Sequence, residues 1–192
     1  GGGSEAGRDG GNDRPLLEAE VPSITIRGVE YSTDERQLEL QNMGLTDADI
    51  QDLRYMVNLT YLNLAGNNIT DLTPISDLTL LENLHLSENN ITDVSPLAEM
   101  DSLEYINLSN NPNLTDLSPL AGLTGMDEFS LYGTPVQDLS FLSGWTGLTR
   151  LDLGDFGDAD LSPLASLTNL RSLNISGSDN MITGLSFLEN MT

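Results

Sequence analysis

The sequence predicts a solenoid, a right-handed β/α superhelix with a parallel concave β-sheet and short 3-10 or helical turns on its convex side. Three observations support this prediction. An apolar residue recurs about every 22 residues, it opens an L-x-x-L-x-L segment, and a P-L or F-L pair follows downstream. The recurring residues are Leu59, Leu81, Leu103, Met126, Leu148 and Leu170. A segment this short cannot bury an apolar face alone, so successive copies must stack and share one core.

The chain divides into three parts along its length. Residues 1–19 are expected to be a flexible linker, because the first fifteen are Gly-rich and polar with no apolar periodicity. Residues 20–58 are expected to form an N-terminal cap and a first atypical repeat, with alternation at Ile24 and Ile26 and a turn near Gly28. Residues 59–192 are expected to hold six repeats, continuous with the cap, and we expect further chain beyond Thr192.

Alternation within each repeat predicts which side chains face outward. Apolar pairs such as Leu62 and Leu64 should point into the core, so the residues beside them form outward columns along the concave sheet. Exposed aromatic residues and arginine contribute most to interface energies, which makes these columns the candidate binding surface. The candidate partner-binding residues are Tyr61, Asn63, His85, Tyr105, Asn107, Glu128, Tyr132, Arg150 and Asp152. The four aromatic ones are expected to cluster toward the middle of the face. The alternative is a solvated polar sheet without a ligand.

An N-x-I-T-D-L-S-P-L run follows each strand and predicts the convex turn. The Ser or Thr before proline is suited to cap a short helical turn. One aspartate per repeat should form an acidic column there, as at Asp71 and Asp93. Calcium binding is one interpretation of this column, but bonding to local backbone amides is favoured, because the loops lack the spacing that wraps an ion. No metal site or cofactor is expected, and Trp145 is assigned to the core.

Three repeats depart from the pattern at the position that Asn67 and Asn89 define. Met43, Thr134 and Phe156 stand there in place of asparagine. The turns of these repeats must therefore satisfy their buried backbone groups in another way.

Composition narrows the classes of function. The chain has 30 acidic and 7 basic residues, all seven of them Arg, for a net charge of -23. Such a surface disfavours nucleic acid and anionic membranes, and it favours solubility first, then cationic partners or divalent ions. Cysteine is absent, which excludes disulfides and thiolate zinc sites. With one histidine and no nucleophile elbow, the chain is expected not to be an enzyme.

The repeats resemble the leucine-rich repeat family, specifically the 22-residue class found in bacterial internalins and in related phosphatase-regulatory proteins. The resemblance extends over residues 37–192. It implies a parallel concave sheet, buried asparagines that bond the backbone turns, and recognition of proteins through the concave face.

We therefore expect a non-enzymatic protein-recognition module of internalin type, secreted or attached to the surface of a bacterium. Its partner would be a protein bound on the concave face, without nucleic acid binding or membrane insertion, and the chain would be a monomer. Carbohydrate or cell-wall binding by the same aromatic and acidic groups is the first alternative. An intracellular phosphatase regulator is the second.

Overall fold

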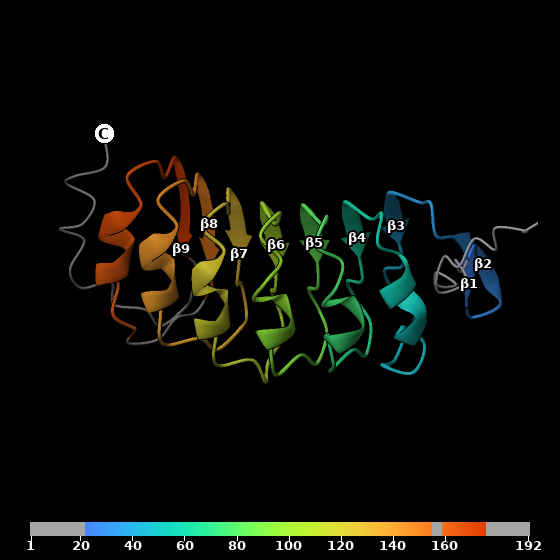
Figure 1. Ribbon diagram of the computed structural model, residues 1–192. Coiled ribbons are helices and arrows are strands. Elements are labelled where there is room, and N and C mark those ends of the chain that lie inside the picture. Colours follow the sequence, from blue (N-terminus) through green and yellow to red (C-terminus); the bar gives the residue numbers. More distant parts are fainter. Residues whose placement is uncertain (1–21, 155–158, 176–192) are drawn as a thin grey trace, which may run out of the picture.

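The structure is a computed structural model that describes residues 22–154 and 159–175. In these ranges a two-stranded hairpin precedes a seven-stranded sheet whose strands follow one another in chain order. Figure 1 shows the seven strands side by side along the length of the molecule, with the short helical turns in a second row. This arrangement confirms the predicted solenoid.

The seven strands of the sheet are short and all parallel. Each pairs with the strand of the next repeat so that equivalent residues lie opposite each other, for example Leu38, Leu62 and Leu84. The strands are β3 (Gln37–Glu39), β4 (Tyr61–Asn63), β5 (Asn83–His85), β6 (Tyr105–Asn107), β7 (Glu128–Ser130), β8 (Arg150–Leu153) and β9 (Ser172–Ile175). We call the surface formed by their outward side chains the concave face.

The core is one continuous apolar cluster between the sheet and the convex turns. The apolar residues that the first repeat contributes to this core are all buried, namely Leu38, Leu40, Leu45, Ile50, Leu53 and Met56. Trp145 is also fully buried, and its ring makes edge-on contacts with Phe129 and Phe141. Its indole N–H donates to the Leu120 carbonyl at 3.3 Å. The assignment of Trp145 to the core is confirmed.

An antiparallel hairpin, β1 (Ser23–Ile26) and β2 (Val29–Ser32), precedes the first repeat. Arg27 and Gly28 form its two-residue turn, both with positive φ, which is the geometry that suits the twist of a hairpin. Ile24 and Ile26 are buried, as their alternation predicts.

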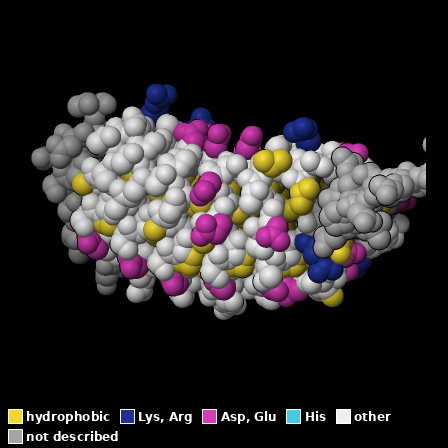
Figure 2. Space-filling view, in the orientation of Figure 1, with side chains coloured by type: hydrophobic (Ala, Val, Ile, Leu, Met, Phe, Trp, Pro, Cys, Tyr) yellow, Lys and Arg dark blue, Asp and Glu magenta, His cyan; other side chains and the backbone are white. Residues whose placement is uncertain are grey.

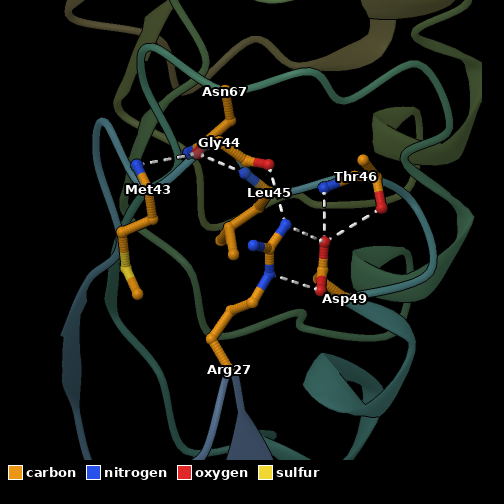
Figure 3. A network of polar contacts seen from close by, with 7 residues as sticks. All are labelled: Arg27, Met43, Gly44, Leu45, Thr46, Asp49 and Asn67. Carbon is orange, nitrogen blue, oxygen red and sulfur yellow. Dashed lines mark hydrogen bonds and ion pairs between the residues drawn. The ribbon is translucent and has the colours of Figure 1, made fainter.

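The Arg27 guanidinium ties this hairpin to the first repeat, as Figure 3 shows. Its Nε and Nη2 donate to the two carboxylate oxygens of Asp49 at 2.7 and 2.9 Å, and Nη2 also donates to the Gly44 carbonyl at 3.0 Å. The carboxylate of Asp49 accepts the backbone N–H of Thr46 at 2.8 Å as well. The guanidinium and these hydrogen bonds hold the pKa of Asp49 well below its usual range.

Buried asparagines connect consecutive repeats. They are Asn67, Asn89 and Asn111, and we call them the asparagine ladder. The Asn67 amide donates to the carbonyls of Leu40 and Leu64, and its Oδ1 accepts the N–H groups of Met43 and Leu45 at 3.1 and 2.9 Å. Two of these contacts are visible in Figure 3. The turn at Met43 has no asparagine of its own. Its backbone N–H groups are instead satisfied by Asn67, the asparagine of the next repeat.

Thr134 replaces the asparagine in another way. Its hydroxyl donates to the Leu108 carbonyl at 2.7 Å and accepts the N–H of Asn111 at 3.2 Å. The repeat before it carries one extra residue near Pro112, and there the Leu114 N–H bonds to the Asn111 carbonyl at 3.1 Å. The extra residue thus provides a backbone acceptor for the Leu114 N–H, which in a regular repeat would donate to an asparagine side chain. Phe156, the third departure, lies outside the described residues.

The convex turns are short 3-10 helices, as expected. They are η1 (Gln51–Tyr55), η2 (Thr73–Ile75), η3 (Ser95–Leu97), η4 (Ser118–Gly122), η5 (Ser140–Gly144) and η6 (Ser162–Ser166). The prediction that the Ser or Thr before proline caps them is wrong. In η3 that residue, Ser95, is already the first helical residue, Val94 stands at the N-cap, and no side-chain cap bond forms.

Instead, the aspartate two residues upstream accepts the backbone N–H of the first helical residue. Asp93 Oδ1 accepts the Ser95 N–H at 2.8 Å, and the same contact recurs in four other repeats. These hydrogen bonds lower the pKa of Asp116, Asp138 and Asp160. The acidic column therefore bonds local backbone amides, as the favoured interpretation states.

The predicted linker at residues 1–19 and the chain beyond residue 175 lie outside the described residues. Among the helices of residues 22–154 and 159–175, none has the length and apolarity that crossing a lipid bilayer requires.

Candidate functional site

The register of the sheet places the candidate residues other than Tyr132 in two columns on the concave face, as predicted. The first residue of each strand forms one column: Gln37, Tyr61, Asn83, Tyr105, Glu128, Arg150 and Ser172. The third residue forms the other: Glu39, Asn63, His85, Asn107, Ser130, Asp152 and Asn174. Side chains in one column are about 4.8 Å from their neighbours, close enough for direct contact.

Three aromatic rings meet near the centre of the concave face. The His85 ring lies 5.3 Å from the ring of Tyr61 and 4.7 Å from that of Tyr105, with tilted planes. We call these three residues the aromatic strip. They come from consecutive strands β4, β5 and β6, and all three side chains are partly exposed. The strip exists because His85 reaches across from the second column to two tyrosines of the first.

Partial burial favours the uncharged form of each ring in the aromatic strip. It raises the pKa of Tyr61 and of Tyr105 and lowers the pKa of His85. The carboxylate of Glu39 adds to the rise at Tyr61 and opposes the fall at His85. The strip is therefore a neutral aromatic surface that lies next to acidic side chains.

Two asparagines of the candidate set are held in place by the turns that follow their strands. Asn63 Oδ1 accepts the Ala65 N–H at 3.1 Å, and Asn107 Oδ1 accepts the Ser109 N–H at 3.0 Å. Asn63 also donates to the carboxylate of Glu39 at 2.8 Å. These contacts fix polar groups beside the aromatic strip.

Glu39 belongs to this site although the candidate set omits it. It touches Asn63 and acts on the pKa of both Tyr61 and His85. The signal that identifies it is its place beside Asn63 in the second column, next to the aromatic residues.

The remaining candidates form an ionic group toward the C-terminal strands. Arg150 donates to Glu128 at 3.1 Å, across β8 and β7, and Asp152 accepts from Asn174 at 3.0 Å. Tyr132 follows β7 and is 50% exposed, the largest exposure among the large apolar and aromatic side chains described. Within the described residues its ring makes no contact with the aromatic strip, so the predicted cluster of four aromatics contains three.

The acidic groups of the described residues show no arrangement typical of a metal centre. No three His, Asp or Glu side chains in residues 22–154 and 159–175 come close enough together to hold an ion. The concave face thus offers aromatic rings, amides and carboxylates for noncovalent contact.

Sequence models of two related families match the chain. The model described as "Leucine Rich repeats (2 copies)" matches residues 79–122, and the one described as "Leucine Rich Repeat" matches residues 58–78. No curated protein sequence matches. Together with the stacked parallel strands and the asparagine ladder, these matches define the chain as a leucine-rich repeat protein.

Solved structures narrow the class further. Internalin C2 from Listeria monocytogenes is 34% identical with a TM-score of 0.77, over 84% of this chain and 71% of that one. Internalin F from the same organism is 30% identical with a TM-score of 0.64, over 85% of this chain and 55% of that one. The chain belongs to the internalin family of leucine-rich repeat proteins. A leucine-rich repeat protein of Leptospira interrogans, 23% identical with a TM-score of 0.57, shares the fold over 65% of this chain and 33% of its own.

Proposed function

We propose that this chain is the recognition module of a secreted or surface-attached bacterial protein, and that it binds a protein partner on its concave face. The observation that carries the proposal is the aromatic strip, in which Tyr61, His85 and Tyr105 contact one another on the concave face. Protein interaction is the general role of the family, and the internalin neighbours support the location outside the cell.

The aromatic strip is not needed to fill the core. The core is filled instead by the central residues of the same strands, Leu62, Leu84 and Ile106, which are fully buried on the opposite side of the sheet. Partly exposed aromatic rings can lose their remaining water contact against a partner, and each such residue contributes about 2 kcal/mol when fully desolvated. The strip therefore has the properties of an interface centre, with Asn63 and Glu39 as polar groups at its edge.

The side chains of the concave face also support a module that binds without catalysing a reaction. Its aromatic, amide and carboxylate side chains are suited to noncovalent contact, so the proposed module acts by binding and not by catalysis. We propose that it does so as a monomer. The chain spans 55% of internalin F, so what the whole protein does beyond this module is part of the proposal.

The test is a binding screen on arrays of purified extracellular proteins and of glycans. Three chains are compared: the wild type, the double variant Tyr61→Ala/Tyr105→Ala, and the control Tyr55→Ala. Tyr55 is also an exposed tyrosine, but it belongs to η1 on the other side of the molecule. We expect saturable binding to a protein that the double variant weakens by at least about 30-fold, which is the loss of about 2 kcal/mol from one of the two tyrosines. The control should change binding by less than about twofold.

Two results would contradict the proposal. Saturable binding to glycans with none to proteins would support the carbohydrate alternative. Equal loss of protein binding in the double variant and in the Tyr55→Ala control would show that the concave face is not the contact surface.

A further inference from the structure

We infer that the partner segment that meets the centre of the concave face is basic, an extended stretch of protein rich in arginine or lysine. This inference rests on the proposed function and names the chemistry of the partner. It comes from a row of carboxylates that the fold assembles at the starts of β5, β6 and β7, and that has no ion pair among the described residues.

The row consists of Glu82, Glu104 and Asp127, the residues that directly precede β5, β6 and β7. The backbone N–H of Glu104 donates to the Glu82 carbonyl at 2.9 Å, and that of Asp127 donates to the Glu104 carbonyl at 2.8 Å. The three residues therefore stand in register in adjacent repeats, about 4.8 Å apart. All three are exposed, and we call them the carboxylate row. In Figure 2 acidic side chains gather along the upper edge of the molecule, between basic ones.

The fold makes little use of the carboxylate row. Among the described residues, neither Glu82 nor Glu104 has a side-chain hydrogen bond or an ion pair. Asp127 accepts one hydrogen bond, from the Thr149 hydroxyl at 2.6 Å. Like charges that lie next to each other in a sheet destabilise it, so a cation placed against the row would relieve repulsion that the free protein carries.

The protein's own cations stand away from the centre of this edge. The same backbone ladder continues through Thr60 to Arg36 at one end and through Thr149 to Arg171 at the other. Arginine is thus present at both ends of the row of repeats, and the middle three positions are acidic. The partner has to supply the positive charge there.

The aromatic strip belongs to β4, β5 and β6, two of which the carboxylate row precedes, and it suits the same partner. Tyr105 directly follows Glu104 in the chain, and its ring contacts His85, which contacts Tyr61. A guanidinium or ammonium group over a tyrosine face is attracted by the ring, and another basic residue of the same segment can pair with a carboxylate of the row. The net charge of -23 steers a basic segment toward the molecule from a distance.

The experiment uses a fluorescein-labelled peptide of six Arg-Ser repeats as the probe, with six Glu-Ser repeats as the peptide control. Binding is measured by fluorescence anisotropy at low and at physiological salt. The test variant neutralises the carboxylate row: Glu82→Gln, Glu104→Gln and Asp127→Asn. The matched variant changes net charge equally at three exposed acidic residues away from the strand starts: Asp77→Asn, Glu99→Gln and Asp101→Asn.

We expect the carboxylate-row variant to weaken binding of the basic peptide about tenfold, as three exposed ion pairs would, and the matched variant to weaken it less than about twofold. The acidic peptide should not bind. Equal weakening by both variants would show that only the overall charge matters and would overturn the inference. No measurable binding of the basic peptide to the wild type would overturn it as well.

A second measurement keeps the test decisive if a variant does not fold. Amide chemical shifts of the wild type are followed as the basic peptide is added. Changes confined to β4–β7 support the inference, and changes spread over η1–η6 contradict it. If a protein ligand is lost by the Tyr61→Ala/Tyr105→Ala variant but kept by the carboxylate-row variant, this inference fails while the proposed function stands.

Discussion

Replacement of one ladder asparagine by alanine should destabilise the whole array. Asn89 is 3% exposed, and its Oδ1 accepts the N–H of Ile69, itself fully buried, at 3.1 Å. Its amide donates to the carbonyls of Leu64 and Leu86 at 2.9 and 3.2 Å. The Asn89→Ala variant therefore leaves the Ile69 amide without a partner and takes one bond from each carbonyl.

The size of the expected destabilisation follows from the hydrogen bonds that each backbone group retains in the variant. The carbonyls of Leu64 and Leu86 each retain one donor, from Asn67 and from Asn111. An orphaned buried amide costs about 1 to 3 kcal/mol, and each lost hydrogen bond costs about 0.5 to 1.5 kcal/mol. We expect Asn89→Ala to lower the free energy of unfolding by roughly 2 to 6 kcal/mol.

The assay is equilibrium unfolding in urea, followed by circular dichroism. The neighbouring Asn90 is exposed, so Asn90→Ala is the matched control and should stay within about 0.5 kcal/mol of the wild type. Asn89→Thr should fall between the two, because a threonine hydroxyl can bond the previous repeat as Thr134 does. A cost below about 1 kcal/mol for Asn89→Ala would refute the reasoning that the ladder holds the repeats together.

Two further predictions concern backbone geometry and charge. Gly133→Ala should destabilise, because the φ of Gly133 is 69° and an added Cβ would clash with Asn110 Oδ1. An added Cβ at Gly122 meets no atom within 4 Å, so Gly122→Ala should be neutral in the same thermal melt. Arg27→Ala should lower the melting temperature at neutral pH, and the difference from the wild type should shrink as the pH falls. The folded state depresses the pKa of Asp49 from 3.8, so the ion pair stabilises above that value and is lost as acid protonates the carboxylate. Melts between pH 2 and 7 check the sign, and a difference that grows in acid would contradict it.

Much of the fold follows from the spacing of the sequence. Leu62, Leu84 and Ile106 recur at 22-residue intervals, and all three are buried at equivalent places in adjacent strands. Period-two alternation then determines that Tyr61 and Tyr105 face outward. Trp145 could be assigned to the core because its register is otherwise occupied by Leu or Met.

Other features could not be read from spacing, since they depend on distances between side chains. The turns were expected to be capped by the Ser or Thr before proline, yet the helix begins at that residue, so the aspartate two positions earlier accepts its amide. Tyr132 was expected to join the other aromatics, but it follows β7 in the turn, and its ring makes no contact with them among the described residues.

The amino-acid sequence by itself determined the stacked repeats, the buried leucines and the order of the outward columns, because parallel strands of constant period convert sequence spacing directly into position. Only the tertiary structure decided which outward side chains meet. The contacts of His85 with two tyrosines, the hydrogen bonds of Thr134 and the pairing of Arg27 with Asp49 join residues some 20 positions or more apart. Their formation depends on the rotamers and local turns of neighbouring repeats, and the repeat period does not contain that information.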